Sequence, residues 1–221
     1  MSTSLLALAT LLTLQPLLRA QAEPEFSPVP PVQARTPQEE AKTFLLPPGY
    51  RLELLVSEPD IAEPMGMAFD AKGRLYVLEM RTYMQEINGA GQQSPTSRVS
   101  VHWSSRNDGV FDQHRVFADN LLLPRLVLPM DDGVLIGETD TNDIWLHRDT
   151  NDDGVSDEKK RVFVGGPRGG NMEHQPSGLL WGLDNWLYMA NNFYRLRWRD
   201  GALVREDIPG NGGQWGASID N

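Results

Sequence analysis

A glycine-rich stretch, residues 165–178 (GGPRGGNMEHQPSG), carries the side chains best suited to catalysis. Histidine is the most frequent general base near neutral pH, so His174 could accept the proton of an alcohol. Arg168 could hold an anion such as a quinone carboxylate, and Asn171 could bind the same cofactor. The alternative is a surface loop whose histidine caps a turn.

A second stretch, Asp149–Asp157 (DTNDDGVSD), has the composition of a cation-binding loop. Oxygen-bearing side chains alternate along it, and the glycine at its sixth position permits a sharp turn. Calcium is the cation that this pattern favours. Its expected ligands are Asp149, Asn151, Asp153, the carbonyl of Val155, and Asp157 or Glu158. The alternative is a solvated Asp-Gly turn without an ion.

Two features qualify the calcium prediction. Lys160 occupies the twelfth position, where an EF-hand has a bidentate glutamate, so the loop is not an EF-hand. A related stretch, Ser104–Asp112, has Ser104 and Arg106 in place of Asp149 and Asn151. We expect that copy to bind no ion tightly.

Other polar and aromatic clusters suggest structural roles. Glu79 and Arg81 could reach a functional site, but an ion pair between neighbouring sheets, the blades of the propeller predicted below, is the favoured interpretation. Trp181, Trp186 and Tyr188 could stack on a sugar, but a place in the core is favoured. The four histidines are scattered, which argues against a multi-histidine metal centre.

Short strands separated by Asp-Gly turns must position these residues. The pattern predicts strands in eight places, and no long stretch has helical periodicity. These strands are Tyr50–Val56, Arg74–Leu78, Val99–Trp103, Val134–Gly137, Ile144–His147, Arg161–Val164, Trp186–Ala190 and Tyr194–Trp198. The sequence therefore predicts an all-β fold.

The strands recur as copies of one unit. Residues 66–77 (GMAFDAKGRLYV) align without a gap with residues 178–189 (GLLWGLDNWLYM), and residues 132–136 form a shorter copy. Residues 99–117 resemble residues 144–163, and residues 215–220 resemble the start of another unit. This regularity is typical of a β-propeller, here three blades and the start of a fourth. An ordinary antiparallel sandwich is the alternative.

The N-terminal residues have the pattern of an export signal followed by a tether. An apolar run from Leu5 to Leu18 precedes Ala20-Gln21-Ala22, which predicts a signal peptide over residues 1–22. Because the run is too short to span a bilayer, we expect a secreted or periplasmic protein with no stable membrane span after cleavage. An uncleaved anchor is the alternative, because residues 1–4 contain no Lys or Arg. Five prolines in residues 23–43 predict a tether with a helical turn at Gln38–Lys42, and the β domain occupies residues 44–221.

Composition excludes several classes of protein. The 221 residues include 20 Lys and Arg against 30 Asp and Glu, and the net charge of −10 disfavours nucleic acid as a partner. There is no cysteine, so the chain can form no disulfide, thiolate metal site or thioether-linked haem.

Several motifs together resemble one family. They are residues 46–59 (LPPGYRLELLVSEP), residues 67–81 (MAFDAKGRLYVLEMR), the acidic loop and residues 173–188 (EHQPSGLLWGLDNWLY). The set resembles the membrane-bound dehydrogenase propellers of PVC-group bacteria, which are similar to soluble quinoprotein glucose/sorbosone dehydrogenases. The resemblance covers residues 44–221.

The resemblance implies an exported propeller, six-bladed when complete, that oxidises a sugar or related alcohol with pyrroloquinoline quinone and calcium. It implies that His174 accepts the hydroxyl proton, that hydride passes to the quinone, and that a c-type cytochrome could accept the electrons. Three blades alone are expected to be inactive. The competing hypotheses are a calcium-dependent hydrolase of the gluconolactonase type and a non-catalytic propeller that binds glycans or proteins.

Overall fold

The computed structural model describes residues 33–210 and 212–218, in two compact units divided between Thr43 and Phe44. The first unit contains a short helix, α1 (Pro37–Glu40), followed by a 3-10 turn, η1 (Ala41–Thr43), where the sequence predicted a helical turn. Thr36 caps α1, because its hydroxyl oxygen accepts the backbone N–H of Glu39. No described helix is long and apolar enough to cross a membrane. The predicted signal peptide lies outside the described residues.

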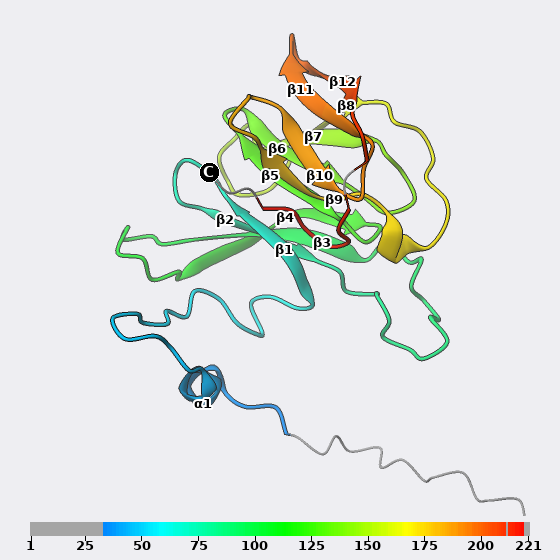
Figure 1. Ribbon diagram of the computed structural model, residues 1–221. Coiled ribbons are helices and arrows are strands. Elements are labelled where there is room, and N and C mark those ends of the chain that lie inside the picture. The colour runs from blue at the N-terminus through cyan, green and yellow to red at the C-terminus, as the bar shows by residue number, and fades with distance from the viewer. Residues whose placement is uncertain (1–32, 211, 219–221) are drawn as a thin grey trace, which may run out of the picture. The chain divides into compact units, whose positions relative to one another are not determined.

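The second unit is all-β, as the sequence predicted, and consists of three four-stranded antiparallel sheets (Figure 1). The first sheet comprises β1 (Pro64–Phe69), β2 (Leu75–Glu79), β3 (Ser97–Trp103) and β4 (Gln113–Leu121). The second comprises β5 (Leu126–Met130), β6 (Gly133–Gly137), β7 (Ile144–Arg148) and β8 (Glu158–Phe163). The third comprises β9 (Ser177–Trp181), β10 (Leu187–Ala190), β11 (Tyr194–Arg199) and β12 (Ala202–Asp207). Within each sheet the strands are hydrogen-bonded in chain order.

The first strand of each sheet lies against the first strand of the next. β1 contacts β5 and β5 contacts β9, while the last strands of the second and third sheets, β8 and β12, also contact each other. We call β1, β5 and β9 the inner strands. Sheets that meet along their inner strands are arranged as consecutive propeller blades are.

Two apolar cores hold the sheets together. Tyr76, Leu78 and Phe117 of the first sheet pack against Val127, Val134 and Ile136 of the second. Leu128, Leu135 and Leu146, on the other face of the second sheet, pack against Leu179, Leu187 and Leu196 of the third. The second sheet is therefore apolar on both faces, which is what a blade between two neighbours requires.

One of the eight predicted strands is absent, and five observed strands, β1, β4, β5, β9 and β12, were not among the eight. The segment 50–56 was predicted as a strand, but it forms none and pairs with no described strand. Leu55 and Val56 instead pack against Leu75 and Val77 of the first sheet. A strand needs a hydrogen-bonding neighbour, and propensity alone does not supply one.

The copy predicted at residues 215–220 contains no strand in its described part, residues 215–218. Residues 219 and 220 lie outside the described part of the chain. The start of a fourth blade therefore stays a prediction.

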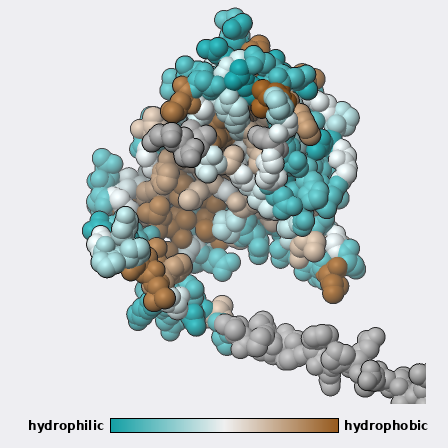
Figure 2. Space-filling view, in the orientation of Figure 1, coloured by the Kyte–Doolittle hydropathy of each residue, from teal (hydrophilic) through white to brown (hydrophobic). Residues whose placement is uncertain are grey.

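One face of the first sheet carries exposed apolar side chains. Figure 2 shows hydrophobic residues gathered on the molecule, and the exposed ones on this sheet and the segment before it include Leu52, Leu54, Met67 and Phe69. Among the described residues no further sheet covers this face. The closed six-bladed ring therefore stays a prediction.

A buried histidine in the second sheet makes the stability of the fold sensitive to pH. The imidazole of His147 is only 5% exposed, its Nδ1 lies 3.3 Å from the Ser156 hydroxyl, and its Nε2 has no hydrogen-bond partner among the described residues. Burial lowers the pKa of His147 to about 4, and nearby Lys159 adds to the effect. The folded protein therefore keeps this histidine neutral.

Acidification should destabilise the protein between about pH 6.5 and pH 4, because the unfolded chain binds a proton at His147 that the folded chain does not. The free energy of unfolding should fall by roughly 3 kcal/mol from this group alone. Chemical denaturation as a function of pH measures the loss. His147→Asn should flatten the profile and His174→Asn, at an exposed position, should not. An unchanged profile in His147→Asn would show that this histidine does not control acid stability.

Candidate functional site

The inner strands all run in the same direction, so the two predicted sites, the glycine-rich stretch and the acidic loop, can be assigned to one end of the sheets or the other. Arg125, just before β5, binds the carbonyls of Gln175 and Pro176, just before β9. Phe69, Met130 and Trp181, the last residues of the three inner strands, line one common cavity. The inner strands therefore run in parallel. We call the end where they begin the loop end, and the end where they finish the turn end.

The glycine-rich stretch lies at the loop end and is tied down at its base. The backbone N–H groups of Gly165 and Gly166 each donate to Asp143 Oδ1 at 2.9 Å, and Arg161 Nη1 lies 3.0 Å from Asp143 Oδ2. Burial alone would raise the pKa of Asp143, but these hydrogen bonds lower it. Gly165 lies so close to Asn142 that a side chain would not fit. The stretch therefore leaves the second sheet along a fixed path.

His174 is exposed, and its backbone is held by the other residues predicted for the site. Its carbonyl accepts from Arg168 Nη2 at 3.1 Å and from the Asn191 amide, and its N–H donates to the Asn171 carbonyl at 3.0 Å. Asn171 also caps the 3-10 turn η2 (Met172–His174) by accepting the N–H of Glu173. The ring of His174 makes no hydrogen bond to any described residue, so it is open to a ligand.

Arg168 and Asn171, predicted to bind a cofactor, use their side chains on the backbone of the same loop. In this arrangement they position His174. The structure therefore brings the three predicted residues together, with His174 exposed.

Tyr83, from the loop after β2, joins this loop to the first sheet. Its hydroxyl donates to Glu173 Oε1, and its ring packs edge-to-face with the Trp215 ring, with 5.5 Å between the ring centroids. Burial, together with Glu173, raises the pKa of Tyr83 to about 12, so the phenol stays a donor at neutral pH. Tyr83 and Trp215 also line a small cavity of about 180 Å³ with Glu63, Pro64, Met65 and Met80.

Glu79 does not form the ion pair predicted between blades. It is fully buried and accepts from Arg98 Nε at 2.9 Å and from the backbone N–H of Ala62 at 2.9 Å. Arg98 is its neighbour across β2 and β3, so the pair lies within one sheet and does not use Arg81. The prediction was wrong because sequence proximity suggested the partner, whereas strand register determines it.

Arg125 is a site residue that the sequence did not suggest. Its side chain is 1% exposed, its Nε and Nη2 donate to the Pro176 and Gln175 carbonyls at 3.2 and 3.0 Å, and its guanidinium lies 4.5 Å from the Trp215 ring. Among the described residues Nη1 has no hydrogen-bond partner, and no carboxylate there forms an ion pair with this group. Burial lowers the pKa of Arg125 to about 10, which leaves it charged at neutral pH.

A buried cation without a counter-ion is costly unless a ligand compensates it. The sequence feature that could have indicated Arg125 is a single arginine inside an otherwise apolar run, residues 121–130 (LLLPRLVLPM), directly before an inner strand. Gln175 adds a second link at this end, because its amide exchanges two 2.7 Å hydrogen bonds with Asp140. Loops from all three sheets thus converge on the residues around His174.

The acidic loop lies between β7 and β8, at the turn end and away from His174. The carboxylate of Asp149 accepts the backbone N–H groups of Asp153 and Gly154 at 3.0 and 2.8 Å, and Asp157 accepts from Thr150. The predicted ligands therefore share one compact turn. Within residues 33–210 and 212–218 no group of three or more His, Asp or Glu side chains is arranged to hold a metal ion.

The related turn between β3 and β4 contains an arginine that pairs with its carboxylates. Arg106 lies 2.9 Å from Asp108 and 3.5 Å from Asp112. Its hydrogen bond is the largest cause that lowers the pKa of Asp108 to about 2. In the acidic loop the corresponding position is Asn151, whose amide donates to Asp153. The two copies form similar turns but differ in the source of the neutralising cation: residues 104–112 contain their own arginine, whereas Asp152 of the acidic loop lies 3.8 Å from Nη1 of Arg74, just before β2.

The three aromatic residues singled out in the sequence separate in space. Trp181 is partly exposed and lines the cavity at the turn end. Trp186 lies under Arg195, 4.3 Å from the guanidinium carbon, and the Tyr188 hydroxyl donates to Asp184 at 2.8 Å. Only Trp181 therefore borders a cavity that could hold a ligand.

Comparison with known proteins identifies a family without a described activity. A search of curated proteins finds no match. The family model DUF7133, a domain of unknown function, matches residues 36–220, so the chain belongs to the DUF7133 family.

Proposed function

We propose that the loop end is the catalytic end of an exported, quinoprotein-like dehydrogenase that oxidises a sugar or related alcohol. The proposal rests on the proximity of two groups. His174 has an exposed imidazole and a backbone fixed by Arg168. The next residue, Gln175, accepts through its carbonyl from the buried guanidinium of Arg125. A proton acceptor and an unsatisfied cation thus share one site. The resemblance of the sequence to quinoprotein dehydrogenases supports this combination.

Two features of the loop end support pyrroloquinoline quinone, a planar aromatic tricarboxylate, as the proposed cofactor. Arg125 Nη1 is a buried donor with no acceptor in the described part of the chain, so a carboxylate would satisfy it. Trp215 and Tyr83 border the adjoining cavity and offer aromatic surface. Arg125, Trp215 and Tyr83 would hold the cofactor, in place of Arg168 and Asn171, whose side chains bind the loop. When bound, the quinone would supply the hydride acceptor.

The chain's own residues would bind and deprotonate the substrate. A neutral imidazole at position 174 would accept the hydroxyl proton as the carbon–hydrogen bond breaks. Arg168 and Asn171 would hold the backbone of His174 in place and so limit where its ring can lie. Tyr83, through Glu173, would fix the loop to the first sheet. A c-type cytochrome is the proposed electron acceptor.

The acidic loop would bind calcium as a structural ion. Its copy carries an internal cation, Arg106, whereas the acidic loop has Asn151 at that position. Because the loop lies at the turn end, an ion there would stabilise the β7–β8 turn and would not touch the quinone.

The two alternative functions are a gluconolactonase-type hydrolase and a non-catalytic binding propeller. A dye-reduction assay distinguishes them from the dehydrogenase.

In the full-length protein supplied with quinone and calcium, His174→Asn should lower the rate of dye reduction with sugars at least about 100-fold, because the proton acceptor is lost. His114→Asn changes a half-exposed histidine of the first sheet and should leave the rate unchanged. Lactone hydrolysis without quinone would favour the hydrolase. Absence of both reactions would favour the binding propeller.

Arg125→Gln should weaken the binding of pyrroloquinoline quinone about tenfold or more, because a charge-assisted hydrogen bond is removed. Titration followed by the quinone's absorbance measures this without turnover. Arg199→Gln, at an exposed position of β11, is the control. Thermal melting of both variants tests whether they fold. Equal affinity of folded Arg125→Gln and the original protein would remove Arg125 from the cofactor site.

Calcium should raise the melting temperature, because an ion bound only by the folded loop stabilises it. Asp149→Asn and Asp157→Asn should each remove most of the shift, and a chelator should reverse it. Asp112→Asn, in the copy with its own arginine, is the matched control and should keep the shift. A shift that survives Asp149→Asn would place the ion elsewhere.

A further inference from the structure

We propose that the cavity at the turn end is a second binding site, specific for a neutral sugar. The cavity has a volume of about 800 Å³ and is bordered by the last residues of all three inner strands, Phe69, Met130 and Trp181. Cavities of roughly 300–1,000 Å³ hold small-molecule ligands. It lies at the opposite end from His174, so this inference does not depend on the proposed dehydrogenase activity.

Two tryptophans in the cavity have rings that no cation covers. Trp145, Trp186 and Trp215 each lie under an arginine or lysine side chain, whereas Trp181 and Trp198 have no such partner among the described residues. Trp181 is 37% exposed at the end of β9, and Trp198 lies on β11 of the same sheet. The exposed indole of Trp181 suits the C–H face of a sugar ring, while Trp198 also packs against the core between the second and third sheets.

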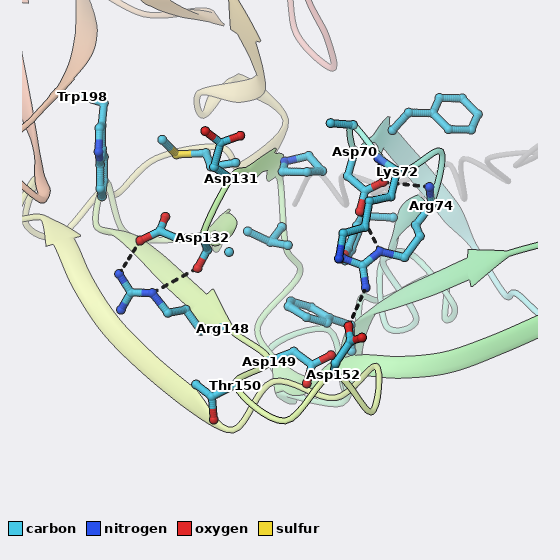
Figure 3. Close-up of a pocket in the computed structure, with 18 of the residues that line it drawn as sticks. Asp70, Lys72, Arg74, Asp131, Asp132, Arg148, Asp149, Thr150, Asp152 and Trp198 are labelled. Carbon is cyan, nitrogen blue, oxygen red and sulfur yellow. Dashed lines mark hydrogen bonds and ion pairs between the residues drawn. The ribbon is translucent and has the colours of Figure 1, made fainter.

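The remaining wall of the cavity mixes charges of both signs (Figure 3). Its five carboxylates and three cations give a net charge of −2, which disfavours phosphorylated or carboxylated ligands. These residues are Asp70, Asp131, Asp132, Asp149, Asp152, Lys72, Arg74 and Arg148. The excess of two carboxylates would attract a cationic ligand, so the preference for a neutral ligand rests on which of these charges already have partners.

Most of these charges already have partners, which leaves one acceptor and one donor open. Arg148 Nη2 lies 2.7 Å from Asp132 Oδ2, and Arg74 Nε lies 2.7 Å from Asp70 Oδ2. Among the described residues, the Asp131 carboxylate and the Lys72 ammonium make no ion pair or hydrogen bond. In Figure 3 Asp131 lies between Trp198 and the turn that carries Lys72. Sugar hydroxyl groups both donate and accept, so they match this pair.

Isothermal calorimetry with a panel of neutral sugars (glucose, galactose, mannose, xylose, fucose and cellobiose) at millimolar concentrations tests the proposal without quinone. We expect at least one to bind. Trp181→Ala should weaken that binding about tenfold and Asp131→Asn about fivefold, because stacking and a charged acceptor are lost. Asp131 is exposed and unpartnered, so this variant should fold normally.

Matched controls separate this site from the loop end. Trp186→Ala and Asp200→Asn remove the same groups outside the cavity and should bind normally. His174→Asn should also bind normally. Sugar binding that is lost in His174→Asn and kept in Asp131→Asn would place the sugar at the loop end. Failure of every sugar, or preferential binding of tetramethylammonium or glucose 6-phosphate, would also overturn the proposal.

Discussion

The whole arrangement depends on the second sheet using both of its faces. In β5, Leu126 and Leu128 face the third sheet while Val127 faces the first, and β6 repeats the alternation with Leu135 against Val134 and Ile136. Because successive side chains of a strand point to opposite faces, this alternation lets one sheet take part in two apolar cores. A register slip of one residue would exchange the two faces and disrupt both cores.

This packing fixes which residues can act together. Since the inner strands run in parallel, the loops that precede them meet at one end, where His174, Arg125 and Tyr83 gather, and the turns that follow meet at the other. The acidic loop belongs to the second group, although it is close to the glycine-rich loop in sequence. Strand β8 separates them. A proposed calcium ion and a proposed catalytic base are therefore assigned separate roles.

The repeats and the Asp-Gly turns predicted the all-β fold and most middle strands, because those strands carry β-branched and aromatic residues. Of the inner strands, β1 and β9 were seen only as repeats and β5 was not predicted, since Pro64, Pro129 and Gly178 weaken the strand pattern, which an edge strand tolerates. His174, Arg168 and Asn171 were singled out as candidates because they share one loop. Arg125 was not found, because its role depends on the carbonyls of Gln175 and Pro176, which only the packing of β5 and β9 brings near.

The separation of the two ends can be measured directly, because the chain has no cysteine and a pair of introduced cysteines would be the only labelling sites. Spin labels at positions 153 and 174, one on the acidic loop and one on the glycine-rich loop, report the distance by pulsed electron paramagnetic resonance. The six residues of β8 span about 20 Å, so we expect a distribution centred at about 20 Å or beyond. A distribution centred below about 15 Å would place both loops at one end and contradict the two-ended organisation.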